Sequence, residues 1–254
     1  MLFRSNHEFD YGLPELRQRL KESKFPVLSA NVHGVPEVLP FTVVHVKGIR
    51  IGIIGVTLEN LREETHPNHL KTITVSKIHD AVAEILPKVR AQSDVIFAVG
   101  HLDIKDQIRL AEAFPEIRLF VTGHNHVARS TEVGQTLIVE TGSKTENLGK
   151  VEIQFKGTTV ESMTSRLLPI HQIAKDPQIE AIIAPYEHQL KPRADEHIGE
   201  SSVTLTKSYT QESALNNLVA DAMREFAGTQ ISIQNIGGIR GTLRKGPITY
   251  RSEE

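Results

Sequence analysis

The chain has 254 residues and a formal net charge of −2, from 29 basic and 31 acidic side chains, so no strong electrostatic field favours nucleic acid as a partner. It has no cysteine, which excludes disulfides and thiolate metal ligands, so any metal must be held by nitrogen and oxygen atoms. No apolar run reaches the roughly 18 residues of a membrane-spanning helix, and the first residues lack the apolar core of a signal peptide.

The first segment is polar and chemically rich. Residues 6–12, Asn-His-Glu-Phe-Asp-Tyr-Gly, place an amide, an imidazole and two carboxylates close together. Histidine can bind a metal and can also carry a proton near neutral pH. An amphipathic helix is expected to follow from Gly12 to about Ser23, with Leu16 and Leu20 on one face.

Extended segments come next. Residues 25–30 are predicted to form a strand, and residues 41–46 and 49–56 a β-hairpin that turns at Lys47-Gly48. The second hairpin run is apolar on both faces and contains two glycines, which indicates a buried strand that other backbone approaches closely. The polar residues 59–72 are predicted to form a surface loop.

The middle of the chain alternates between helices and strands. Residues 75–91 have helical periodicity, although Pro87 is expected to kink or shorten that helix. Strand, helix and strand in succession indicate an α/β unit, and later strands without helices indicate a β-rich second layer. The expected elements are buried strands at 94–100 and 117–121, a helix near 104–113, and strands at 136–140, 148–155 and 159–167.

The last third begins with a clear helix start. Asp176 and Pro177 suit the N-cap and first turn of a helix, which Pro192 is expected to end. The polar residues 193–200 follow, so a domain boundary is expected between about 170 and 200. A helix at about 211–227 and a short strand at 230–234 are predicted beyond it.

Three of the 12 histidines stand directly after buried strands. Ligands of α/β sheets bind beyond the carboxyl ends of the strands, so His101, His124 and His126 are expected to meet at one rim. The rings of His124 and His126 share a side if the backbone is extended there. Taken singly, a histidine after a strand such as His101 is more often a surface or core residue than a ligand, whereas for the His124-x-His126 pair the two interpretations are equally good. Apart from His7 in the opening motif, the eight others are expected to be solvated: His33, His45, His66, His69, His79, His171, His188 and His197.

A glycine-rich turn, Asn235-Ile-Gly-Gly-Ile-Arg240, lies near the end of the chain. It is either a simple tight turn or an anion site. In the second case the backbone amides would form a concave nest of donors and Arg240 would add a fork suited to phosphate.

Three motifs, in order, resemble those of the calcineurin-like metallophosphoesterases, and specifically the 5'-nucleotidase family. They are Ser5-Asn-His-Glu-Phe-Asp10, Val99-Gly-His-Leu102 and Gly123-His-Asn-His126. Residues 212–223 and 235–240 are similar to the C-terminal domain of that family. The resemblance implies an α/β fold with a two-layer β-sandwich flanked by helices, then a partial α+β domain. The implied domains are a metallophosphoesterase domain at 1–170, a linker helix at 171–200 and a substrate-binding domain at 201–254.

The resemblance also implies a mechanism in which two divalent metal ions, about 3.5–4 Å apart, clamp a phosphate. Zinc, manganese or a similar ion would suit the nitrogen and oxygen ligands. Asn6, His101 and His124 would bind one ion and His126 the other, while His7, oriented by Asp10, would stabilise the transition state and assist the leaving group. The implied substrate-binding residues are Asn235, Gly237, Gly238 and Arg240.

Some features of the family pattern are missing. The family's first two metal motifs lie upstream of the Asn-His-Glu motif, and only five residues precede Asn6. Ser5, Asp103 and Asn216 replace usual glycines, and Tyr209 replaces a usual arginine. We therefore expect an internal piece of a 5'-nucleotidase-like enzyme that lacks both ends, binds one metal weakly and hydrolyses little.

The main functional prediction is hydrolysis of nucleoside 5'-monophosphates. The alternatives are a cyclic-nucleotide or UDP-sugar phosphohydrolase with the same metal core, and a non-catalytic binding protein with a remnant metal site. No nucleic-acid partner is expected, and the oligomeric state is left open. The resemblance implies a periplasmic, wall-bound or secreted protein, with a cytoplasmic location as the alternative.

Overall fold

The computed structural model describes residues 5–171, 173–239 and 241–253. The chain divides into two compact units, Met1–Ile173 and Ala174–Glu254, and each is described by itself.

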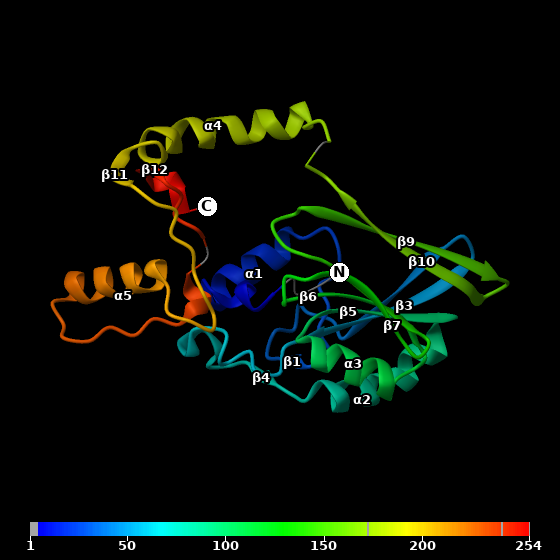
Figure 1. The fold of residues 1–254 in the computed structure, drawn as a ribbon. Coiled ribbons are helices and arrows are strands. Elements are labelled where there is room, and N and C mark those ends of the chain that lie inside the picture. Colours follow the sequence, from blue (N-terminus) through cyan, green and yellow to red (C-terminus); the bar gives the residue numbers. More distant parts are fainter. Residues whose placement is uncertain (1–4, 172, 240, 254) are drawn as a thin grey trace. The chain divides into compact units, whose positions relative to one another are not determined.

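Unit 1 is built on a six-stranded mixed sheet with the strand order β2-β3-β5-β6-β8-β7 (Figure 1). The four inner strands are parallel, and the two edge strands are antiparallel to their neighbours. The predicted hairpin at Lys47-Gly48 is confirmed, while β7 was not predicted. The strands are β2 (Phe41–Val46), β3 (Ile49–Thr57), β5 (Val95–His101), β6 (Ile117–Gly123), β7 (Ala128–Val133) and β8 (Thr136–Thr141).

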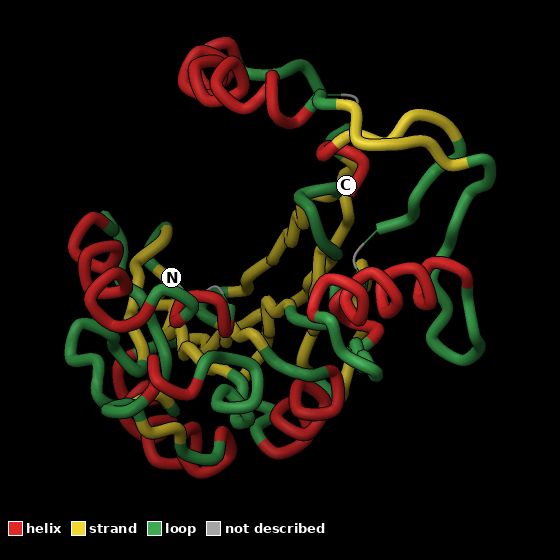
Figure 2. The backbone as a smooth tube through the Cα atoms, turned by 90° about the vertical axis from the view of Figure 1, so that its left-hand side faces the viewer, coloured by secondary structure: helices red, strands yellow, loops and turns green. Residues whose placement is uncertain are grey.

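Two helices, α2 (Ile78–Gln92) and α3 (Ile104–Ala113), cover one face of this sheet (Figures 1 and 2). The predicted helix is confirmed as α2, and its apolar side packs in the main core with the apolar residues of β3, β5, β6 and β8. The expectation that Pro87 shortens the helix is wrong, because α2 continues to Gln92. Leu86 and Val89, on either side of Pro87, are buried, and this burial offsets the energetic cost of the backbone hydrogen bond that proline cannot donate.

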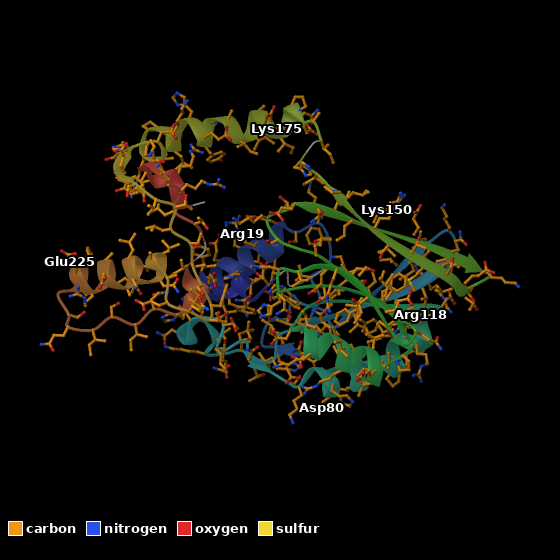
Figure 3. The ribbon with its side chains drawn as sticks, in the orientation of Figure 1. Arg19, Asp80, Arg118, Lys150, Lys175 and Glu225 are labelled. Atoms are coloured by element: carbon orange, nitrogen blue, oxygen red, sulfur yellow. The ribbon has the colours of Figure 1, made fainter. Side chains whose placement is uncertain are left out.

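A long hairpin of β9 (Asn147–Lys156) and β10 (Thr159–Pro169) provides the second β layer. Lys150, labelled in Figure 3, lies on β9 and pairs with Glu152 at 2.9 Å. The apolar side chains of the hairpin pack on the face of the main sheet opposite α2 and α3, so the predicted α/β class with a β-rich second layer is confirmed. The contacts join Val151, Ile153 and Met163 to Leu119, Leu137 and Val139.

The N-terminal part of unit 1 has a small core of its own. It contains a 3-10 turn, η1 (Asn6–Phe9), and the helix α1 (Gly12–Glu22), which confirms the predicted helix. The prediction of a surface loop at 59–72 is wrong in part, because Leu61 and Leu70 are fully buried in this core. The remaining elements here are η2 (Pro67–Leu70) and the paired strands β1 (Val32–His33) and β4 (Thr74–Val75).

The predicted strand at 25–30 is wrong, since the segment forms only an isolated bridge from Leu28 to Leu39. A buried side chain does part of the pairing instead: the Asn31 amide donates to the Thr57 carbonyl at 2.7 Å and accepts from the Thr57 amide at 2.9 Å. The close backbone approach predicted for β3 is confirmed, because a Cβ atom on Gly55 would lie 2.3 Å from the Leu28 carbonyl oxygen.

Unit 2 starts with α4 (Pro177–Ala194), and Asp176 caps it by accepting from the Gln178 amide at 2.8 Å, as predicted. Two predictions are wrong: Pro192 lies inside this helix, and residues 230–234 form no strand. The strand β11 (His197–Ser201) pairs with β12 (Gly246–Thr249), so part of the polar segment 193–200 is β-structure. The other elements are α5 (Ala214–Ala227) and the short turns η3 (Ile236–Gly238) and η4 (Tyr250–Glu253).

Unit 2 buries little apolar surface. Within the described part of the chain α4 has no buried residue, and Leu215 is the one buried residue of α5. Phe226, next to the labelled Glu225 in Figure 3, is 97% exposed. None of the helices that the structure describes has the length and hydrophobicity needed to cross a bilayer.

Candidate metal-binding active site

Two neighbouring parallel strands bring the central histidines together. Strand β5 ends at His101 and β6 ends at Gly123, and these two residues are directly paired in the sheet. The carboxyl ends of parallel strands lie at one edge, which is where ligands of α/β folds bind. His124 follows Gly123 and therefore reaches the same edge as His101.

The two imidazoles face each other through ring nitrogens. His124 Nδ1 lies 3.2 Å from His101 Nε2, and the ring centroids are 4.9 Å apart with an interplanar angle of 73°. Two nitrogens bound to one tetrahedral ion at about 2.0–2.1 Å are roughly 3.3 Å apart. The observed spacing therefore fits two imidazoles that share one divalent ion.

The environment of His101 favours its neutral form. Burial lowers its pKa from 6.5 to about 4, and repulsion from the imidazoles of His124, His7 and His126 adds to this effect. A metal ligand must be the neutral imidazole, so His101 needs no proton removed at neutral pH. The same interactions place the four imidazoles within electrostatic range of one another, although Asn6 is linked to this group only through its neighbour His7.

The loop after β6 has an unusual backbone. His124 has φ +117° and His126 has φ +58°, both in the region that L residues rarely adopt. The extended backbone that would put the rings of His124 and His126 on one side is therefore not present, because the loop turns sharply as soon as β6 ends. Strained non-glycine backbone of this kind costs about 1–3 kcal/mol and clusters at functional sites.

The opening motif forms the turn η1, which Ser5 caps by accepting from the His7 amide at 3.1 Å. Asn6 is 5% exposed, and its Nδ2 atom donates to the Glu64 carbonyl at 3.1 Å, which leaves Oδ1 as its ligand-capable atom. His7 Nδ1 lies 2.7 Å from Asp10 Oδ2. A carboxylate only accepts, so Nδ1 carries the hydrogen and Nε2 is the atom that can exchange a proton with a substrate.

Sequence reasoning missed several side chains around this edge. Asp103 lies 3.6 Å from His124 Nε2, and Asn125 bridges from the loop of His124 to the start of α3. Behind them Gln107 donates to the Leu102 carbonyl at 2.8 Å and to the buried Glu140 at 2.9 Å. The only sequence signal was a carboxylate two residues after His101, and nothing in the pattern linked it to a histidine 21 positions away.

The protein groups available for a metal are few. No set of three or more His, Cys, Asp or Glu side chains in residues 5–171, 173–239 and 241–253 could hold a metal ion. The donor set that the structure brings together is the His101–His124 pair, and a further protein ligand would have to be of another type, such as the Asn6 amide oxygen.

The residues proposed for substrate binding lie in unit 2. The Gly238 amide donates to the Asn235 carbonyl at 3.0 Å, so the turn η3 itself uses one of the amides of the expected anion nest. Gln234 donates to the Asn235 side-chain oxygen at 3.0 Å. Gly237 lies within the same turn, and Arg240 lies outside the described residues.

Comparison with known proteins adds an independent observation. Residues 193–252 match the family model described as 5'-nucleotidase, C-terminal domain. A solved 5'-nucleotidase precursor from Thermus thermophilus has a TM-score of 0.85 with this chain at 26% identity, covering 96% of this chain and 55% of that one. This chain is a relative of the 5'-nucleotidases. The resemblance inferred from its motifs is thereby confirmed.

Two further proteins are similar to this 5'-nucleotidase-like chain. Endonuclease YhcR of Bacillus subtilis (strain 168) is 28% identical over 277 residues, which are 96% of this chain and 23% of that protein. The calcineurin-like phosphoesterase YfkN from Bacillus subtilis shares the fold, with a TM-score of 0.64 at 21% identity over 74% of this chain and 70% of that one. The chain spans 20% to 56% of the length of the curated relatives that it matches.

Proposed function

We propose that this chain serves the metal-dependent hydrolysis of phosphomonoesters, with nucleoside 5'-monophosphates as substrates. The observation that carries the proposal is the His101–His124 pair, whose nitrogens face each other at 3.2 Å at the carboxyl edge of the parallel strands. Two relatives are themselves named a 5'-nucleotidase and a trifunctional nucleotide phosphoesterase, which supports phosphate esters of nucleotides as the substrate class.

In this proposal His101 Nε2 and His124 Nδ1 hold one divalent ion, together with the Oδ1 atom of Asn6. His126 serves a second ion. A divalent ion bound there supplies Lewis-acid polarisation of a phosphoryl oxygen. The left-handed backbone of His124 and His126 fixes where their rings can reach, so the loop positions donors without rearranging.

His7 and Asp10 serve the proton transfer to the leaving group. Asp10 accepts from His7 Nδ1 at 2.7 Å, which fixes the ring orientation and leaves Nε2 to donate to the leaving oxygen. The His7 side chain is 64% exposed, so a substrate can reach it from solvent.

Our proposal assigns residues 1–170 to the metallophosphoesterase domain, 171–200 to a linker helix and 201–254 to a substrate-binding domain. Asn235, Gly237, Gly238 and Arg240 would contact the nucleotide. The proposal extends to a periplasmic, wall-bound or secreted location, which cell fractionation would test.

The decisive experiment is phosphate release from AMP by purified chain loaded with Mn²⁺ or Zn²⁺. We expect slow, metal-dependent release that is lost in His124→Ala and lowered about 10²–10⁴-fold in His7→Ala, the range for removal of a general acid. The expected rates are low, so each loss has to be compared with a substitution of the same kind outside the site. The matched control is His188→Ala, which replaces an exposed histidine on α4 and should keep the full rate. Tight metal binding without release from any phosphomonoester would contradict the proposal.

Phosphodiesters are the second candidate substrates, because one relative is named an endonuclease. A panel of AMP, a cyclic nucleotide, UDP-glucose and single-stranded oligonucleotide separates the alternatives. Preferential cleavage of the diesters would replace the monoester assignment. A metal-free, inactive but well-folded chain would favour a binding protein.

A further inference from the structure

Asp103 stands at the N-cap of α3 but does not cap it. Its backbone has the non-helical conformation of an N-cap, with φ −58° and ψ 146°, yet its side chain makes no capping hydrogen bond. An aspartate in this position normally accepts from an amide of the first turn. Here Asn125 Oδ1 accepts from the Ile104 amide at 2.9 Å instead, so the Asp103 carboxylate is directed elsewhere.

That carboxylate faces His124. Asp103 Oδ1 lies 3.6 Å from His124 Nε2, and the two side chains are 29% and 20% exposed. Asn125 Nδ2 donates to the same Oδ1 atom at 3.3 Å. Asn125 therefore caps the helix with its oxygen and holds the carboxylate toward His124 with its nitrogen. The other charged group nearby is Lys105, whose Nζ lies 3.9 Å from Oδ2 on a largely exposed side chain.

The two nitrogens of His124 thus have different partners. Nδ1 faces His101 Nε2 at 3.2 Å, and Nε2 faces Asp103. The lone pairs of the two ring nitrogens point away from each other, so a group at Nε2 cannot share an ion with Nδ1. Asp103 is therefore not a ligand of an ion held by His101 and His124, which agrees with the absence of a three-residue metal group in the described part of the chain.

We propose that Asp103 is a positioning residue that accepts the Nε2 hydrogen of His124 and keeps the Nδ1 lone pair free for a divalent cation. This inference rests on the metal site of the proposed function. Metal-binding histidines commonly donate their second ring hydrogen to a carboxylate, which fixes the tautomer and raises ligand basicity. At 3.6 Å the contact is longer than a hydrogen bond, but the negative charge of the carboxylate at this distance already favours the tautomer whose hydrogen faces it.

The test has two readouts. In the metal-free chain, ¹⁵N shifts of the His124 ring report its tautomer; we expect Nε2–H to predominate and this preference to be lost in Asp103→Ala. In calorimetric titration with Zn²⁺, Asp103→Ala should weaken binding about 10–100-fold. Asp103→Asn keeps an acceptor oxygen and should lie between, and it also serves if the alanine variant folds poorly.

The matched control is Asp106→Ala, because Asp106 lies in the first turn of the same helix and pairs only with Arg109, at 3.4 Å, among the ion pairs of the described residues. It removes the same charge and should leave both readouts within about twofold. Equal weakening of Zn²⁺ binding by Asp103→Ala and Asp106→Ala would show that only the loss of a negative charge matters, and would overturn the inference. An unchanged His124 tautomer in Asp103→Ala would also overturn it. A chain that binds Zn²⁺ but releases no phosphate would contradict the proposed function alone, since the tautomer readout needs neither metal nor turnover.

Discussion

At the scale of single residues, the burial of His101 determines both its readiness to bind a metal and its response to acid. It is the last residue of a buried strand, and burial is the largest cause of its lowered pKa. A ring that resists protonation is ready to bind a metal, but it also makes the metal-free protein sensitive to acid. The burial that keeps the ring neutral for metal binding therefore also lowers the free energy of unfolding at low pH.

The metal-free chain should lose stability as the pH falls from about 6.5 to about 4. The unfolded chain protonates this ring near 6.5 and the folded chain near 4, so between these values the unfolded state holds more protons and the free energy of unfolding decreases as the pH falls. Urea unfolding at pH 7, 5.5 and 4 measures this. His101→Gln should flatten part of the dependence, and identical pH profiles for both proteins would contradict the assignment.

At the scale of elements, a buried network of hydrogen bonds joins α3, β7 and β8 to the residue that follows His101. Arg129 on β7 and Glu140 on β8 are directly opposite each other, and Arg129 Nε donates to Glu140 Oε2 at 2.7 Å. Gln107 on α3 accepts from Arg129 and donates to both Glu140 and the Leu102 carbonyl. Two strands, a helix and the residue after His101 are therefore joined by one set of hydrogen bonds.

Removing the buried acid should be costly. Glu140→Ala leaves Arg129 without its carboxylate, and breaking a buried pair in this way typically costs about 3–5 kcal/mol. Chemical denaturation monitored by circular dichroism measures the change. Glu132→Ala, on the exposed side of β7, is the matched control and should stay within about 0.5 kcal/mol. Equal, small effects of both substitutions would show that the network contributes little.

At the scale of the whole molecule, the proposed metal ligands belong to unit 1 and the match to the 5'-nucleotidase C-terminal domain belongs to unit 2. Unit 1 has three apolar core clusters, whereas unit 2 buries few apolar side chains among its described residues. Binding of a ligand to the folded state stabilises the unit that holds it, so a metal should act on the unfolding of unit 1.

Zn²⁺ or Mn²⁺ at about 100 times its dissociation constant should stabilise the folded protein by about 2.7 kcal/mol. The measurement is the thermal unfolding midpoint with the metal and with a chelator. His124→Ala should abolish the shift, whereas the exposed His188→Ala should retain it. A shift of the same size in both variants would place the metal elsewhere on the chain.

Local pattern alone determined much of this protein. The helix at Gly12, the turn at Lys47-Gly48 and the Asp176 cap follow from short-range preferences that tertiary packing did not override. The order of the three histidine motifs indicated the resemblance to 5'-nucleotidases, because metal chemistry restricts residue types more tightly than a fold does. Pattern failed at residues 25–30 and 230–234, where partners distant in the chain decide whether an extended segment pairs.

Only the tertiary structure decided which atoms meet. His101 and His124 are 23 residues apart, and parallel pairing of β5 with β6 brings their nitrogens to 3.2 Å. The left-handed turn at His124, the diversion of Asp103 from its cap and the Gln107–Glu140–Arg129 network depend on contacts across loops and strands. A sequence records which side chains are present, whereas directions of ring nitrogens and carboxylates are set by backbone angles that local preference does not fix.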